Sequence, residues 1–90
     1  MTRIEMYEKT RNRIDILLRA EPDNPLLESV KLQLQYLKDL EDGKHQDRTR
    51  LKDINLGLIA VREIEGWDDE LADLLHQISA EVRQMVESTK

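Results

Sequence analysis

Apolar residues recur along this chain at intervals of three and four positions, with polar residues between them. That spacing places apolar side chains on one face of an α-helix. Strands are not predicted, because the chain lacks runs of alternating β-branched residues closed by hairpin dipeptides. The pattern therefore predicts an all-α fold, a small up-and-down bundle of about four helices in a single domain over residues 1–90.

Turn-forming residues mark where the first two helices begin and end. Thr2 and Glu5 have the spacing of a capping box, so a helix is predicted to begin after Thr2. Two prolines in residues 21–25 end it, because proline disfavours helical geometry in the preceding residue. The second helix is predicted to follow at once and to end near Gly43, which suits a left-handed C-terminal position.

The third predicted helix, residues 47–64, has apolar residues on more than one side. One set with helical spacing is Leu51, Ile54, Leu58 and Val61, and a second set falls off this stripe, at Leu56, Ile59, Ala60 and Ile64. A helix that is apolar nearly all round is either wrapped by neighbours or covered by a partner. A core helix buried from two sides and an interaction face both fit this pattern.

Gly66 is predicted to close the third helix, and Asp68 to open the fourth at the positive end of the helix dipole. The fourth helix carries the most regular apolar stripe of the chain. Across the bundle we expect five residues to be buried in the core: Leu34, Leu58, Val61, Leu74 and Ile78.

Charge and composition exclude several classes of function. The chain has 19 acidic and 14 basic residues, a net charge of −5, which argues against nucleic-acid binding. Cysteine is absent, so packing must supply the stability. The N-terminus is too charged for a secretory signal, and no apolar run approaches the roughly 20 residues needed to span a bilayer. We therefore expect a cytoplasmic protein that does not enter membranes.

Two carboxylate motifs offer alternatives to a purely structural role. Asp73 and His76 share a helix face, but a zinc site needs three or four ligands, and no metal site is predicted. Glu70 and Asp73 resemble half of the magnesium motif of MazG-type nucleotide pyrophosphohydrolases, whose other half is Glu-x-x-Glu. Asp39 and Asp42 have that spacing but not that residue type.

No nucleophile–base pair and no phosphate-binding glycine loop is recognisable, so the chain is predicted to be no enzyme and to need no cofactor. A small pyrophosphohydrolase and a non-catalytic dimerising adaptor remain as alternatives. Leu32, Tyr36 and Leu40 recur every four residues away from the main stripe of the second helix, and such an apolar surface would also permit a homodimer. Gly57 and Ala60 would let another helix approach closely.

Several short runs in the middle of the chain carry a resemblance to a known family. They are Gln33-Leu34-Gln35-Tyr36-Leu37, Asp47-Arg48, Leu56-Gly57, Ile59-Ala60-Val61-Arg62-Glu63 and Glu70-Leu71. These runs resemble the type VI secretion immunity proteins that neutralise an NAD(P)+ glycohydrolase toxin.

The resemblance implies a small all-α protein that occupies the active-site cleft of a cognate toxin. A cleft that holds dinucleotide phosphates is commonly basic, so acidic residues would complement it. Trp67 is expected either to anchor the contact or to cap the end of the bundle. The candidate contact residues form two groups. Near the end of the second helix they are Tyr36, Asp39, Leu40 and Asp42, and around the turn between the third and fourth helices they are Glu63, Trp67, Asp68 and Asp69.

Overall fold

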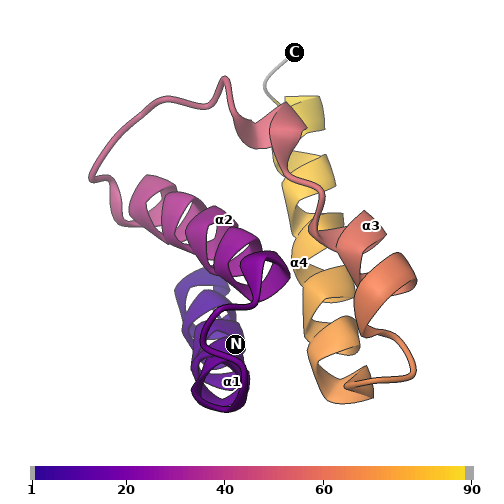
Figure 1. Ribbon diagram of the computed structural model, residues 1–90. Helices are drawn as coiled ribbons and strands as arrows, with labels where there is room; N and C mark the ends of the chain where they lie inside the picture. The colour runs from indigo at the N-terminus through magenta and orange to yellow at the C-terminus, as the bar shows by residue number, and fades with distance from the viewer. Residues whose placement is uncertain (1, 89–90) are drawn as a thin grey trace. The chain divides into compact units, whose positions relative to one another are not determined.

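The computed structural model describes residues 2–88, and over these residues it contains helices and no strand (Figure 1). The all-α prediction is confirmed. None of the helices in this part of the chain combines the length and apolar character that crossing a bilayer requires. The chain divides into two compact units, Met1–Gln46 and Asp47–Lys90. The helices are α1 (Arg3–Ala20), α2 (Pro25–Asp42), α3 (Leu56–Ile59) and α4 (Asp69–Ser88), with a 3-10 helix η1 (Leu51–Asp53) and a π-helix η2 (Ala60–Ile64).

The predicted ends of the first two helices are confirmed. The Thr2 hydroxyl accepts a hydrogen bond from the Glu5 backbone N–H, and the Glu5 carboxylate accepts one from the Thr2 backbone N–H, both at 3.1 Å. Asn24 caps α2 by accepting from the backbone N–H of Leu26 at 2.9 Å. Gly43 ends α2 with a φ of 81°, a conformation that glycine adopts without steric cost.

Polar pairs between α1 and α2 show that these helices run antiparallel. Arg3 lies 3.5 Å from Glu41. Further along, the Lys38–Glu8 and Lys31–Asp15 pairs are 3.6 and 2.9 Å apart. Positions that increase along α1 therefore meet positions that decrease along α2, as a short connection predicts. The buried apolar residues of this unit are Tyr7, Ile14, Leu27, Val30, Leu34 and Leu37.

The prediction of one continuous third helix over residues 47–64 is wrong. The Asp47 carboxylate accepts a hydrogen bond from the backbone N–H of Thr49 at 2.9 Å, which forms a local turn instead of a helix cap. A single 3-10 turn follows at η1, Ile54 has extended backbone, and α3 begins only at Leu56. Competition from a local side-chain hydrogen bond and a break at Ile54 therefore separate the two halves of the expected helix.

This break changes which apolar set is buried. Leu34, Leu74 and Ile78 lie in the core as predicted, whereas the predictions for Leu58 and Val61 are wrong, because these side chains are 50% and 58% exposed. The stripe that joined them to Leu51 assumed helical geometry through residues 54 and 55, where there is none. The set buried instead consists of Leu56, Ile59, Ala60 and Ile64.

The π-turn η2 completes this buried set. In an α-helix, the stripe that starts at Leu56 would continue at Ile59, Ala60 and then position 63. Here the backbone N–H of Glu65 bonds to the carbonyl of Ala60 at 2.9 Å, five residues back, so the turn holds one extra residue. Ile64 consequently takes the buried place, and Glu63 is exposed.

In the second unit, α3 packs closely against α4. A Cβ atom placed on Gly57 would lie 2.6 Å from Ser79 Oγ, so the close approach expected at Gly57 is made to a helix of the same chain. Nearer the other end of α4, Arg48 Nη2 donates to the Met85 carbonyl at 3.3 Å. The apolar residues that α4 buries are Leu71, Ala72, Leu74, Leu75, Ile78, Val82 and Met85.

Candidate functional site

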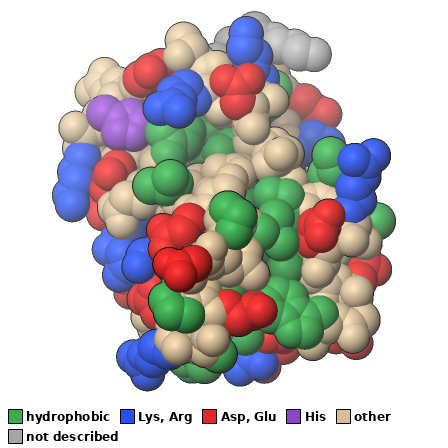
Figure 2. Space-filling view, viewed as in Figure 1, with side chains coloured by type: hydrophobic (Ala, Val, Ile, Leu, Met, Phe, Trp, Pro, Cys, Tyr) green, Lys and Arg blue, Asp and Glu red, His purple; other side chains and the backbone are tan. Residues whose placement is uncertain are grey.

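Exposed apolar side chains concentrate in one short segment of the second unit. Leu58 and Val61 lie three residues apart on the same side of the helix, and Trp67, 48% exposed, follows in the turn. Figure 2 shows hydrophobic side chains reaching the surface with acidic side chains beside them. Single exposed apolar residues are ordinary, but three within ten positions indicate a contact surface.

The turn that carries Trp67 is held by several hydrogen bonds. The carbonyl of Ile64 accepts from the backbone N–H groups of Trp67 and Asp68, both at 2.9 Å. Gly66 has a φ of 86°, and its N–H donates to the Asp69 carboxylate at 2.9 Å. Trp67 is therefore presented on a fixed turn.

Two of the acidic candidates at this turn have structural roles. Asp68 is buried, and its carboxylate caps α4 by accepting from the backbone N–H of Leu71 at 3.1 Å. Asp69 is exposed but also accepts from the turn, while Glu63 is exposed on η2. Asp68 thus shapes the surface, whereas Glu63 and Asp69 present carboxylates to solvent.

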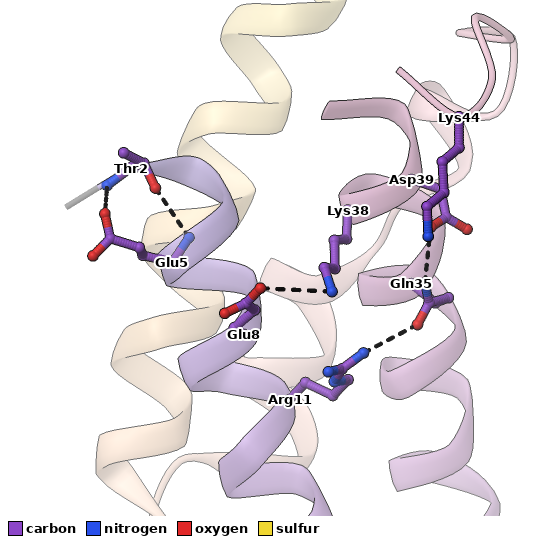
Figure 3. A network of polar contacts seen from close by, with 8 residues as sticks. All are labelled: Thr2, Glu5, Glu8, Arg11, Gln35, Lys38, Asp39 and Lys44. Carbon is purple, nitrogen blue, oxygen red and sulfur yellow. Dashed lines mark hydrogen bonds and ion pairs between the residues drawn. The ribbon is translucent and has the colours of Figure 1, made fainter. Parts of the chain in front are cut away.

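The candidates at the end of α2 are more occupied by the protein itself. Gln35 donates to the Asp39 carboxylate at 2.9 Å and accepts from Arg11 at 3.2 Å (Figure 3). Lys44 lies 3.8 Å from the same Asp39 oxygen. This network ties α1, α2 and the following loop together, so the Asp39 carboxylate is committed within the first unit.

Beside this network, the Tyr36 ring lies against the imidazole of His45, with ring centroids 5.1 Å apart. Tyr36 and Leu40 are half-buried, and Asp42 is exposed. Leu32, one turn before Tyr36, is 69% exposed. The four predicted residues therefore lie together at the end of α2, but Leu32 presents the most apolar surface near them.

The carboxylate and histidine pairs that could bind a metal do not form a metal site in the described residues. His76 Nε2 lies 3.4 Å from the Glu65 carboxylate rather than against Asp73. Within residues 2–88, no three His, Cys, Asp or Glu side chains gather closely enough to hold a metal ion. The Asp39 and Asp42 pair belongs to the first unit, while Glu70 and Asp73 belong to the second.

Comparison with known protein families shows which family this small helical protein belongs to. The Tsi6 family model matches residues 2–84, nearly the whole chain. The chain belongs to the Tsi6 family. The resemblance to an immunity protein family drawn from the sequence is confirmed, and it extends beyond the runs that first indicated it.

Individual Tsi6 relatives agree in sequence and in structure. The chain is 33% identical over 75 residues to the immune protein Tsi6 of Pseudomonas aeruginosa strain PAO1, covering 83% of this chain and 80% of the relative. It superimposes on a chain from a structure of Tse6 in complex with Tsi6 with a TM-score of 0.91 and 28% identity, covering 98% of this chain and 94% of that one. A structure of Tsi6 from Pseudomonas aeruginosa gives a TM-score of 0.83 and 32% identity, with coverage of 91% and 94%.

Sequence reasoning missed Leu58 and Val61 as surface residues because it placed them in the core. Both lie within the Leu56–Glu63 segment that carried the resemblance to the Tsi6 family. The available signal was Asn55, a residue type favoured at helix N-caps, directly before an apolar stripe that begins at Leu56. Starting the helix there would have exposed Leu58.

Proposed function

We propose that this chain is an immunity protein that binds a type VI secreted toxin and blocks its active-site cleft. The main support is membership of the Tsi6 family over residues 2–84. A relative named as an immune protein, and the similarity to a chain from a Tse6–Tsi6 complex, point the same way. The resemblance found in the sequence implies that the toxin is an NAD(P)+ glycohydrolase, acting in the cytoplasm where this protein would meet it.

An inhibitor that occupies a cleft needs a complementary surface and no chemistry of its own. The chain carries a net charge of −5, and the exposed residues Glu63 and Asp69 each follow an exposed apolar residue by two positions in the sequence. A cleft built to hold the phosphates of a dinucleotide is commonly basic, so this surface is suited to filling it. Binding there would exclude the dinucleotide by occupancy.

Co-expression with a candidate toxin from the same genome, sought first among the neighbouring genes, tests this proposal. Cells that make the toxin should lose NAD(P)+ and stop growing, and co-expression of this chain should restore both growth and dinucleotide levels. An Ile78→Asp variant, which places a charge in the core, should fail to protect. If the purified chain neither binds the toxin nor slows its dinucleotide hydrolysis, the proposal is wrong.

The same proposal predicts that the purified chain has no hydrolase activity of its own. Glu70 and Asp73 are exposed on α4, and both lie in the second unit. Incubation of the purified chain with nucleoside triphosphates and Mg²⁺ should release no inorganic pyrophosphate. Turnover that disappears in Glu70→Ala or Asp73→Ala would instead favour a pyrophosphohydrolase.

A further inference from the structure

We infer that the toxin binds the surface formed by Leu58, Val61, Glu63, Trp67 and Asp69, referred to below as the Trp67 face. This inference rests on the proposed immunity function and specifies where the contact lies. The expected partner surface is the rim of the toxin's catalytic cleft, with an apolar pocket bordered by basic side chains. Apolar content, backbone geometry and charge each support this choice.

The apolar part of the Trp67 face has the composition of a binding hot spot. Binding energy usually concentrates in a few residues, and tryptophan is among the most enriched of them. Trp67 is the only tryptophan of the chain, and half of its surface remains open. Leu58 and Val61 add branched apolar side chains on a neighbouring helical turn.

The backbone presents these side chains on a rigid support. The buried residues Leu56, Ile59, Ala60 and Ile64 hold the inner side of the segment. The π-turn moves Glu63 out of the buried stripe, so a carboxylate stands on the outer side without being desolvated in the core. Binding groups on an element fixed by its core contacts lose little entropy on association.

Charge indicates which kind of partner would fit. Residues 58–70 contain five acidic residues and one basic residue, Arg62. Glu63 and Asp69 are exposed, while Glu65 lies near His76. A segment in which exposed apolar residues alternate with a large excess of acidic residues suits an apolar pocket with a basic rim, and it disfavours nucleic acid or an anionic membrane surface.

The surface around Leu32 on α2 is the main competing location. Leu32 is more exposed than any of the three apolar residues of the Trp67 face. One turn before Leu32, Glu28 and Ser29 are exposed. One turn after it, Tyr36 is half-buried and engaged with His45, and further along Asp39 is held by Gln35. Among the described residues of α2, Leu32 is the one exposed large apolar side chain, whereas the Trp67 face has three.

Affinity measurements with the full chain distinguish the two surfaces. The probe is the catalytic domain of the toxin identified in the co-expression test, made as an inactive variant, and binding is measured by titration calorimetry. Trp67→Ala and Val61→Ser should each weaken binding by roughly thirty-fold or more, as expected for hot-spot residues. The matched controls Leu32→Ser and Ile16→Ser, which also change exposed apolar residues, should bind within about threefold of the wild type.

Each variant is first checked for folding by circular dichroism and thermal unfolding. The absence of cysteine allows a second measurement that needs no truncation. The thiol of a Val61→Cys variant should react with a maleimide more slowly when the toxin domain is present at saturation, and that of Leu32→Cys should react at an unchanged rate.

Normal toxin binding by Trp67→Ala and Val61→Ser would overturn the inference and leave the proposed function intact, and loss of binding by Leu32→Ser would then locate the contact on α2. A wild-type chain that fails to bind the toxin would instead remove the proposed function itself. Light scattering on the free chain tests the alternative that a second copy of this chain covers the Trp67 face. A free dimer that Val61→Ser converts to a monomer, without weakening the toxin complex, would also overturn the inference.

Discussion

At the scale of single residues, the missing side chain of Gly57 sets how closely α3 approaches α4. A Cβ atom at this position would lie 2.6 Å from Ser79 Oγ and 3.1 Å from Ser79 Cβ. Gly57→Val should therefore lower the free energy of unfolding by about 1–3 kcal/mol, since overpacking forces neighbouring atoms apart. Urea unfolding followed by circular dichroism measures this, and Leu58→Val, an exposed neighbouring position, is the control. Equal stability of Gly57→Val and the wild type would show that the contact is not limiting.

A second residue-scale prediction concerns the capping box of α1. Hydrogen bonds from the Thr2 backbone and hydroxyl lower the pKa of the Glu5 carboxyl below its usual 4.5. Because the folded-state pKa is lowered, the stabilisation is fully present above pH 4.5 and is lost as the pH falls through the folded value. Glu5→Gln keeps a capping-box residue type without the charge. Its melting temperature should lie below that of the wild type at pH 7, and the two should converge in acid. A difference that does not depend on pH would contradict this assignment.

At the scale of elements, residue types predicted the caps of α1, α2 and α4 correctly, because each depends on a local hydrogen bond. The start of α3 was predicted wrongly because Asp47 is also a good cap residue, but its carboxylate bonds to Thr49 in a turn. The π-turn could not be predicted, since a period of 3.6 contains no extra residue. Leu56, Ile59 and Ala60 fit that period, whereas Ile64 lies one position beyond it.

This extra residue leads to a prediction for a single-residue deletion. Removing Arg62 would move Ile64 to the seventh position after Leu56, so an uninterrupted α-helix would bury the same apolar set. The Arg62 deletion should therefore remain folded with its helical content preserved, as measured by far-UV circular dichroism and thermal unfolding. Binding to the toxin should nonetheless weaken, because without the extra residue the Glu63 side chain would point in a different direction on the exposed side of the helix.

Deletion of Asp73, an exposed residue of α4, is the matched control. In a regular α-helix the loss of one residue rotates everything beyond it by about 100°. The deletion would turn Leu74, Leu75 and Ile78 out of the core, and it should unfold the protein. If both deletions unfold the chain equally, the extra residue is not what separates η2 from an α-helix.

At the scale of the whole molecule, the sequence predicted the fold class and the helical order, because apolar spacing and cap residues are local properties. The immunity family was also predicted correctly, from short runs such as Leu56-Gly57. Exposure was harder to predict. Leu58 and Val61 fit a helical stripe as well as the buried residues do, and the start of α3 at Leu56, together with its packing against α4, decides between the two sets. The contact residues themselves stay a prediction.

Net charge acts on the whole molecule and leads to the last prediction. The chain carries a charge of −5, and the proposed partner cleft is basic, so long-range attraction should speed their encounter. Screening shortens the range of this attraction to about 10 Å at 0.1 M salt and about 3 Å at 1 M. Stopped-flow association with the toxin domain should therefore slow by roughly tenfold or more over that range, with a smaller change in dissociation.

Glu63→Gln combined with Glu70→Gln should reduce the low-salt association rate and flatten its salt dependence. Val61→Ser should instead act mainly on dissociation, because it removes contact area and no charge. An association rate that salt leaves unchanged would show that apolar contact alone brings the two proteins together.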